Sequence, residues 1–281
     1  NGGGSLTEVV DIMGLFMNSG PVVQVKDGNG RVQVMRNKQN DPIWTGPLVI
    51  MQNELSASAS EILAGAMKDY GRAVIVGSPN SFGKGTVQTF VELNRFLNST
   101  DDFGSLKLTI QKFYRINGKS TQLKGVESDI PMKDVFSYEE IGERFDNYAL
   151  PWDQVNSSSF TVSNPINVAG LAKNSQSRMA QNKFYQLLLE SAQWREKLDK
   201  EEKISLNLKE FEAVMKTRKA QIEKFKPLIK YNNGLNFALH AEEVSRGKTD
   251  EVFAKKSENW MKNLKRDIYL QETVNIISEL K

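Results

Sequence analysis

Hydrophobic positions recur with two different periods in the first part of the chain. In residues 6–16 the apolar side chains stand at helical spacing, which predicts a helix with Ser5 as its N-cap and Gly20 as its end. Residues 21–25 and 31–35 instead flank the turn sequence DGNG, and this arrangement predicts a β-hairpin. The chain is therefore expected to begin with a helix and two paired strands.

Two nearly continuous apolar runs, residues 46–52 and 72–77, indicate buried strands. Between them, the apolar residues from Ile62 to Tyr70 form one stripe at helical spacing, and Gly71 is expected to end that helix. A strand, a helix and a strand in so short a span make a βαβ unit, which is typical of a mostly parallel sheet covered by helices. We therefore expect an α/β fold for this part of the chain.

The pattern changes at residues 150–165, which are polar and rich in turn residues and are interpreted as a linker. Beyond them the apolar spacing is helical, and Glu and Lys side chains are paired at the spacing of neighbouring helical turns. The stretches 182–198 and 207–225 are clear examples. We predict an α/β domain at residues 1–155 and a mainly α-helical domain at residues 156–281.

Composition narrows the classes of function. With 281 residues, 25% charged and 39% hydrophobic, the chain is typical of a globular protein of one or two domains. A net charge of +3 is too small to indicate nucleic acid as a partner, and no apolar run approaches the roughly 20 residues that span a bilayer. The absence of cysteine excludes disulfides, thiolate catalysis and cysteine-ligated metal sites. Because the chain begins at Asn1 rather than at a methionine, we interpret it as a piece of a longer protein.

The single histidine, His240, limits the catalytic schemes that the chain can carry. It lies in a polar, helical region, where a surface or capping histidine is expected. Sites built from several histidines are excluded, and His240 would have to serve any Ser-His-Asp triad. If a serine is a nucleophile here, a group other than histidine is expected to activate it.

Three serines stand on alternate positions in LSASASE, directly before a predicted helix. One interpretation is helix capping, since serine at the N-cap stabilises a helix by about 1 kcal/mol relative to alanine. The other is a nucleophile, because the free amides and positive dipole end of a helix N-terminus can stabilise an oxyanion. Ser60 is expected to take part in the cap and Ser56 to belong to the strand end, while Ser58 lies at the turn between them. The residues alone leave all three serines open.

The stretch GSPNSFGKGTVQ carries a lysine among glycines. It resembles a phosphate-binding P-loop, but five residues separate Gly77 from Gly83 where the motif has four, and Gly85 stands where Ser or Thr would hold Mg²⁺. Nucleotide binding is therefore disfavoured. Lys84 could instead act as a general base, provided that burial lowers the pKa of its amine from the usual value of about 10.4. The alternative is an exposed loop lysine.

Two further features could support such a nucleophile and base. If the chain after Gly85 is extended, Lys84, Thr86 and Gln88 share a face, so the neutral amide of Gln88 could orient the lysine amine. The alternative for Gln88 is a solvent-facing side chain on a strand. The glycines of the N-terminal NGGGS either bring a main-chain amide to a ligand as an oxyanion donor or only form a tight turn.

Together these segments resemble one family. The order and approximate spacing found in the carboxy-terminal processing peptidases of family S41 recur here in NGGGSLTE, SASASEILAGAMKDYGRAVIVG, SFGKGTVQ and IQKFYRINGKSTQLKGVESDI. The match is closer to the bacterial tail-specific proteases of that family, whose C-terminal region resembles LPWDQV and the charged helical tail with YLQETVNIISEL. The resemblance covers essentially the whole chain.

The resemblance implies a partial ClpP/crotonase-like α/β core and a serine endopeptidase with a Ser-Lys catalytic dyad. It implies neither a metal nor a cofactor. The residues that match the family's site are the nucleophile Ser58, the general base Lys84, the supporting amide Gln88, and the oxyanion-hole amides of Ala59, Gly4 and its neighbour Gly3. The loop GSPNSFGKG is one residue longer than the family's usual loop.

By the same resemblance, the substrates are proteins with accessible, apolar C-terminal tails that add to the enzyme as extended strands. The expected compartment is the bacterial periplasm, where an adaptor protein is an expected partner. Family members carry a PDZ-type domain and the first strands of the protease core upstream of NGGG, and neither is in this chain. We therefore expect a fragment that holds the catalytic residues and is not necessarily active alone.

Two other classes of function compete with this interpretation. One is a non-catalytic helical scaffold or binding module, in which the serines are caps and Lys84 is exposed. The other is a phosphate-binding protein that uses GSPNSFGKG. The surroundings of Lys84 and of its loop distinguish the three.

Overall fold

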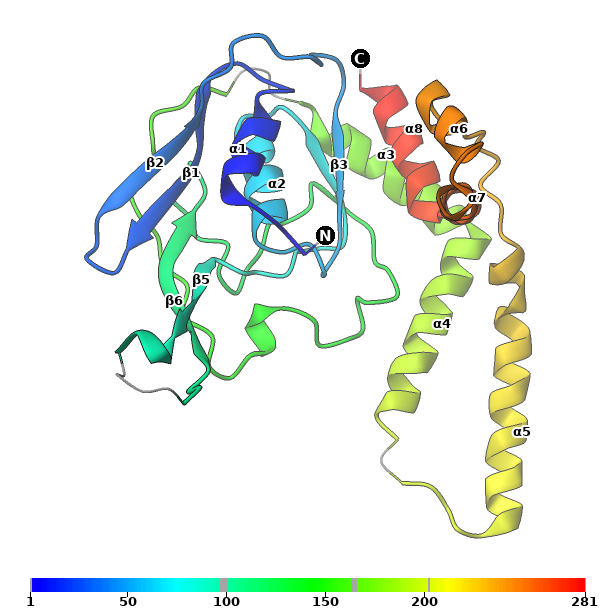
Figure 1. Cartoon of the computed structure of the whole chain (residues 1–281). Coiled ribbons are helices and arrows are strands. Elements are labelled where there is room, and N and C mark those ends of the chain that lie inside the picture. Colours follow the sequence, from blue (N-terminus) through cyan, green and yellow to red (C-terminus); the bar gives the residue numbers. More distant parts are fainter. Residues whose placement is uncertain (1, 97–100, 163–165, 202, 281) are drawn as a thin grey trace. The chain divides into compact units, whose positions relative to one another are not determined.

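The structure is a computed structural model, and it describes residues 2–96, 101–162, 166–201 and 203–280 (Figure 1). The chain folds into two compact units. Unit 1 consists of Asn1–Met132 and Glu140–Val168, and unit 2 consists of Lys133–Glu139 and Ala169–Lys281. The predicted division into domains at residue 155 stays a prediction, and residues 163–165 of the predicted linker lie outside the described residues.

Unit 1 contains an antiparallel sheet of four strands and a parallel sheet of three. The strands of the first, in spatial order, are β2 (Val32–Asn37), β1 (Gly20–Asp27), β6 (Ser105–Tyr114) and β5 (Thr86–Glu92); those of the second are β3 (Val49–Gln52), β4 (Val74–Gly77) and β7 (Ile130–Pro131). The predicted hairpin is confirmed, since β1 and β2 pair antiparallel. The expectation of a mostly parallel sheet is wrong for the larger sheet, because β6 returns to pair antiparallel with both β1 and β5.

The predicted βαβ unit is confirmed in the smaller sheet. β3 and β4 are parallel neighbours, and the helix α2 (Ala59–Asp69) connects them. Gly71 follows the C-cap of α2 with a φ of 65°, a conformation that glycine adopts without strain. An α/β unit followed by a mainly helical one is therefore confirmed as the fold class.

The first helix, α1 (Leu6–Met13), is shorter than predicted. Ser5 is its N-cap, as expected, and its hydroxyl accepts a hydrogen bond from Glu8 N. The predicted end at Gly20 is wrong: Gly14 is the C-cap, and Gly20 begins β1. The apolar spacing continues past Gly14, but glycine in a helix interior costs about 1 kcal/mol relative to alanine, and the chain leaves the helix there.

The core of unit 1 lies where α1 and α2 pack together against the sheets. Its most buried side chains come from every one of these elements; they include Met13, Val23, Met67, Ile75 and Phe113, each at most 1% exposed. This core fixes the ends of β3 and β4. Because the carboxyl ends of parallel strands lie at one edge of a sheet, the segments that follow β3 and β4 meet there.

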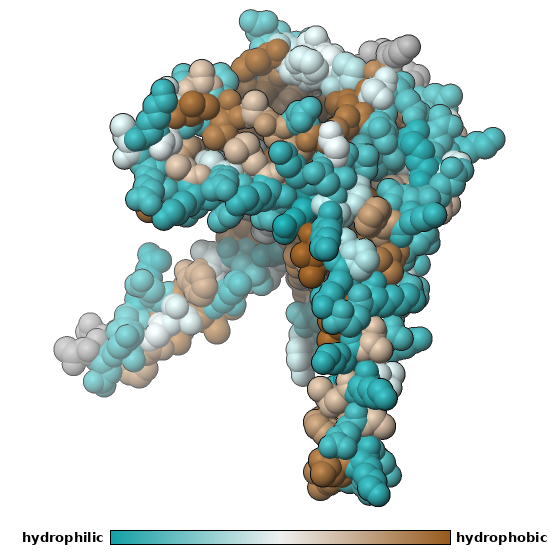
Figure 2. Space-filling view, turned by 90° about the vertical axis from the view of Figure 1, so that its right-hand side faces the viewer, coloured by the Kyte–Doolittle hydropathy of each residue, from teal (hydrophilic) through white to brown (hydrophobic). Residues whose placement is uncertain are grey.

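The hairpin of β5 and β6 presents apolar side chains to solvent. Leu106, Leu108 and Ile110 alternate along β6, and all three are exposed, as is Phe90 on β5. In Figure 2, brown and tan side chains gather along an arm of unit 1 that ends in grey atoms. β5 is also an edge strand, so one side of its backbone is unpaired in the described sheet.

Unit 2 is built from helices and one preceding segment of chain. Its helices are α3 (Val168–Gln181), α4 (Lys183–Asp199), α5 (Leu208–Phe225), α6 (Ala241–Gly247), α7 (Glu251–Lys265) and α8 (Ile268–Glu279). The helices predicted at 182–198 and 207–225 are confirmed, with Asn182 and Asn207 as their N-caps. None of the helices in the described part of the chain is both long and apolar enough to cross a bilayer.

Two sets of side-chain contacts hold unit 2 together across long stretches of sequence. Arg178 on α3 binds Glu272 and Glu279 on α8, and Arg178 Nη2 lies 2.7 Å from Glu272 Oε1. The Lys133–Glu139 segment is bound by α4 and α8: the hydroxyls of Tyr185 and Tyr269 donate to the Lys133 carbonyl at 3.0 and 3.1 Å. A segment that precedes part of unit 1 in sequence thus belongs to unit 2.

Candidate active site

Ser58 lies at the turn between β3 and α2, in a conformation that few non-glycine residues adopt. It is the N-cap of α2, with φ 57° and ψ −117°. Backbones held in such sparsely populated regions cost about 1–3 kcal/mol and concentrate at functional sites. Capping and strain therefore occur at the same serine.

The other two serines of the stretch have ordinary structural positions. Ser60 is the second residue of α2, not its cap. β3 ends at Gln52, so the expectation that Ser56 belongs to the strand end is wrong. Ser56 lies in the following turn, where its hydroxyl accepts a hydrogen bond from Asn53 N at 3.0 Å. Of the three, Ser58 alone has a positive φ.

Glu61 connects the Ser58 turn to the loop that carries Lys84. Its side chain is fully buried, and Ser58 N donates to Oε2 at 2.8 Å. Lys84 N donates to the same oxygen at 3.0 Å. Oε1 accepts from Gly83 N at 2.7 Å and from the Ser81 hydroxyl at 2.6 Å. One carboxylate thus holds the main chain at Ser58 and at Lys84 together.

Burial and hydrogen bonding act in opposite directions on Glu61. Desolvation raises the pKa of its carboxyl to about 7, and the donors from Ser81, Gly83, Ser58 and Lys84 limit that rise by stabilising the ionised form. The four-donor arrangement is complete only when the carboxylate is ionised, because a proton on either oxygen would face N–H or O–H donors. The geometry of this region is therefore coupled to pH near neutrality.

The main chain of Lys84 is held on both sides, and its side chain is half-buried. Lys84 O accepts a hydrogen bond from Thr121 Oγ1 at 3.0 Å, opposite to the bond from Lys84 N to Glu61. The neighbouring glycines allow this close approach, because a Cβ at Gly85 would lie 2.7 Å from Gln122 N. Gly85 N in turn donates to Gln122 Oε1 at 2.8 Å.

Gly3 packs directly against the Ser58 turn, whereas Gly4 has open space around it. A Cβ at Gly3 would lie 2.9 Å from Ser58 Cβ and 3.0 Å from Ala59 N, and the φ of Gly3 is 88°. A Cβ at Gly4 would meet no atom within 4 Å. The main chain at Gly3 therefore lies close to the start of α2 and to the amide of Ala59.

Gln88 lies apart from this cluster of contacts. It is on β5, opposite Thr109 of β6, and its side chain is exposed. Gln122 is the amide side chain that the structure buries beside the lysine loop, with Nε2 donating to Glu143 Oε1 at 3.2 Å. The predicted role of Gln88 stays a prediction.

The surroundings of the lysine loop argue against phosphate binding by GSPNSFGKG. A P-loop offers its main-chain amides to phosphate. Here the amides of Gly83 and Lys84 already donate to Glu61, which places a carboxylate where an anion would have to bind.

The described residues contain no group of three or more His, Asp or Glu side chains placed to hold a metal ion. His240 is exposed at the N-cap of α6, a surface and capping position as expected.

Glu61 is the residue that the sequence pattern did not single out. The spacing Ser58-x-x-Glu61 is that of a capping box, which predicts the contact from Ser58 N to Glu61. The contacts of the same carboxylate with Ser81, Gly83 and Lys84 join residues 20 to 23 positions apart. No local pattern encodes them, because they depend on the parallel pairing of β3 and β4.

Two family models match successive parts of the chain. Residues 1–132 match the model described as peptidase family S41. Residues 136–281, just over half of the chain, match the model described as the C-terminal domain of tail specific protease.

Individual relatives agree with these models. A tail-specific protease of Haemophilus influenzae is 48% identical over 176 residues, which are 62% of this chain and 25% of that protein. A carboxy-terminal-processing protease of Bartonella bacilliformis is 39% identical over 132 residues, 46% of this chain and 28% of that protein. A solved photosystem II D1 C-terminal processing protease is 30% identical and covers 47% of this chain and 32% of its own, with a TM-score of 0.41, too low to add to the argument. The aligned parts thus span about a quarter of the two curated relatives.

Proposed function

The chain belongs to peptidase family S41 and carries the C-terminal domain of tail specific protease, and from this premise we propose that it supplies the catalytic residues of a serine endopeptidase. In this proposal Ser58 is the nucleophile and Lys84 the general base. The observation that carries it is the shared Glu61 carboxylate, which holds a strained serine turn and the lysine loop at one point. Strained backbone of this kind concentrates at functional sites, which favours a catalytic role for Ser58 over a scaffold.

The reaction follows from the two side chains. A neutral Lys84 amine takes the proton of the Ser58 hydroxyl as the serine oxygen bonds to the scissile carbonyl carbon. When the tetrahedral intermediate collapses, the C–N bond breaks and the protonated Lys84 gives its proton to the leaving amine. Water then attacks the acyl ester, Lys84 takes the proton of that water, and the acid leaves as Ser58 regains its hydrogen.

Main-chain amides stabilise the oxyanion in this scheme. The amide of Ala59 lies at the start of α2, where the helix dipole is positive, and the NGGG segment supplies the second donor from Gly4 or from its neighbour Gly3. Loss of one such donor typically costs about 3 kcal/mol of transition-state stabilisation. Gln88 is proposed to orient the lysine amine.

The substrate is proposed to be an apolar C-terminal tail in extended form. β5 begins two residues after Lys84 and is an edge strand, so an extended peptide could pair with its free backbone. The exposed apolar side chains of the β5–β6 hairpin, Phe90 among them, offer surface to the side chains of such a tail. By resemblance to its family, the protein is proposed to act in the bacterial periplasm with an adaptor protein as partner.

The test is cleavage of an unfolded protein with an apolar tail by this chain joined to an upstream PDZ-type segment. We expect Ser58→Ala and Lys84→Ala each to lower the cleavage rate roughly a thousandfold or more. Ser60→Ala and Lys38→Ala serve as matched controls, because Ser60 lies inside α2 and Lys38 is exposed outside the site. Equal cleavage by wild type and Ser58→Ala would contradict the proposal and favour a scaffold.

A further inference from the structure

Unit 1 contains a cavity with several cationic side chains in its lining, outside the site described above. Its volume is about 470 Å³, within the range of small-molecule sites, which is about 300–1,000 Å³. Four basic side chains and one carboxylate line it; they are Arg115, Lys119, Lys124, Arg144 and Glu127. The remaining wall comes mainly from Trp152 and from the chain between Ser120 and Gly125.

Most of this positive charge is not neutralised by the protein. No carboxylate lies within ion-pair distance of Lys119, Lys124 or Arg144 in the part of the chain that the structure describes. Lys124 Nζ lies 3.8 Å from the centre of the Trp152 ring, a cation–π contact that leaves its charge in place. Trp152 is fixed in turn, because its Nε1 donates to Ser120 O at 2.9 Å.

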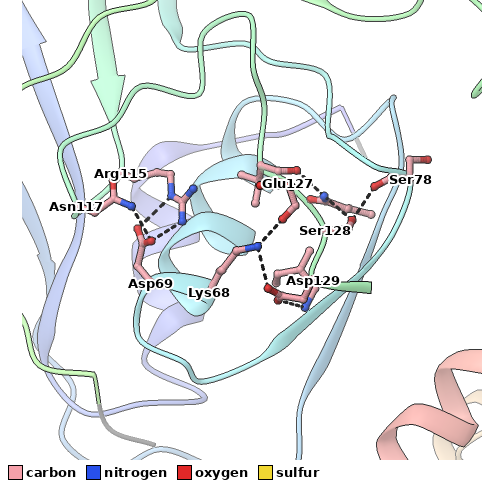
Figure 3. A network of polar contacts seen from close by, with 11 residues as sticks. Lys68, Asp69, Ser78, Arg115, Asn117, Glu127, Ser128 and Asp129 are labelled. Atoms are coloured by element: carbon pink, nitrogen blue, oxygen red, sulfur yellow. Dashed lines mark hydrogen bonds and ion pairs between the residues drawn. The ribbon is translucent and has the colours of Figure 1, made fainter. Parts of the chain in front are cut away.

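Arg115 is the anchored member of the set. Its Nε donates to Asp69 Oδ2 at 3.1 Å and its Nη2 binds the other oxygen of the same carboxylate, while Asn117 donates to Asp69 at 2.8 Å (Figure 3). Its Nη1 makes no hydrogen bond to a described residue, so the two N–H groups of that nitrogen stay available. A guanidinium held in this way is pre-organised to bind phosphate or carboxylate oxygens.

We propose that this cavity binds a small ligand that carries two or more phosphate or carboxylate groups. The basic residues surround one open pocket and do not form an extended stripe, and the chain as a whole carries a net charge of only +3. This favours a compact polyanion over nucleic acid, which binds along extended basic surfaces. The proposal needs no catalytic activity and stands apart from the proposed function.

The wall of the cavity is also in contact with the lysine loop. Leu123 N donates to Gly83 O at 2.8 Å, and Val126 N donates to the Ser81 hydroxyl at 2.7 Å. Arg144 Nη2, itself part of the lining, donates to Ser81 O at 3.3 Å. A bound polyanion would therefore lie one hydrogen bond away from the segment that holds Lys84.

The test is titration of the chain with pyrophosphate and, separately, with citrate, at constant ionic strength set by chloride. Calorimetry measures the affinity, and Trp152 fluorescence, isolated by comparison with Trp152→Phe, reports whether the ligand enters this cavity. We expect saturable binding of one anion, weakened about tenfold or more in Lys119→Ala/Lys124→Ala. Binding of pyrophosphate alone would assign a phosphate ligand, and binding of citrate alone a carboxylate ligand.

The control is Lys38→Ala/Lys107→Ala, which removes the same charge from exposed positions of the same unit outside the cavity. We expect this variant to bind like the wild type. Thermal unfolding verifies that both variants fold, which is expected because all four lysines are exposed. Absence of binding at millimolar anion, or equal weakening in the two double variants, would overturn the proposal.

Discussion

At the scale of single residues, Ser58 and Glu61 show how a site conformation is maintained against its own strain. Among the described residues, only Ser58 and Leu123 combine a side chain with a positive φ. The carboxylate of Glu61 compensates at Ser58 by binding its amide and, through Gly83 and Lys84, the neighbouring loop. These contacts fix the main chain of Ser58 in its sparsely populated conformation.

The strain at Ser58 predicts an unusual order of stability for two substitutions at this position. Glycine caps helices almost as well as serine and adopts positive φ freely, whereas alanine does neither. We therefore expect Ser58→Gly to be more stable than Ser58→Ala by about 1–2 kcal/mol in urea unfolding. At Ser60, inside α2, the order should reverse, with glycine about 1 kcal/mol less stable than alanine. The same order at both positions would show that Ser58 is not strained.

The pKa of Glu61 predicts a pH dependence of stability. Burial raises the pKa of this carboxyl from 4.5 to about 7 in the folded chain, so between these values the folded state binds a proton that the unfolded state has released. The contribution of Glu61 to stability is therefore full below pH 4.5 and is lost as the pH rises through 7, with a total of about 3 kcal/mol. We expect this loss in wild-type urea unfolding between pH 4.5 and 7, and its absence in Glu61→Gln. Parallel pH profiles for the two proteins would contradict it.

At the scale of elements, local sequence patterns predict the structure correctly where the segments that pair or pack are close in sequence. The β1–β2 hairpin, the β3–α2–β4 unit and the long helices α4 and α5 all follow from local signals, namely apolar spacing, turn residues and Glu–Lys pairs. The antiparallel sheet was not, because β6 pairs with β1 across more than 80 residues, and no local signal encodes that choice. The same limit applies to the site: the candidate serines and the lysine came from motifs, and their link through Glu61 came from the fold.

Gly77 is the position where the parallel pairing of β3 and β4 leaves least room. It pairs with Gln52, has a φ of 124°, and a Cβ there would lie 1.9 Å from the Gln52 carbonyl oxygen. We expect Gly77→Ala to destabilise unit 1 by about 3 kcal/mol or more, through collision and backbone strain together. Gly28→Ala is the control, since a Cβ there meets nothing within 4 Å. Similar urea midpoints for the two variants would rule out this close approach.

At the scale of the whole molecule, both units are closed by contacts between residues far apart in the chain. In unit 2, Arg178 on its first helix binds Glu272 and Glu279 on its last. The Glu272 side chain is only 4% exposed, so its charge depends on Arg178 for compensation. This ion pair therefore fixes the ends of the helical unit to each other.

Removal of Arg178 is expected to cost more than removal of an exposed arginine. Arg178→Met leaves a buried, unpaired carboxylate and should destabilise unit 2 by about 3 kcal/mol, as followed by the fluorescence of Trp194 and Trp260. The added substitution Glu272→Gln should restore part of the loss. Arg195→Met, which breaks a half-exposed pair with Glu139, should cost less than about 1 kcal/mol. Equal losses for the two arginines would refute the argument.

The Lys133–Glu139 segment also has a consequence for the order of events during translation. Lys133 leaves the ribosome 136 residues before Tyr269, one of the two tyrosines whose hydroxyls bind its carbonyl. At about 5–20 residues per second, that interval is on the order of ten seconds. Within this interval both parts of unit 1 have left the ribosome, whereas the Lys133–Glu139 segment between them cannot yet bind Tyr269. A chaperone or protease that acts on the growing polypeptide therefore encounters unit 2 before its Lys133–Glu139 segment has made all of its contacts.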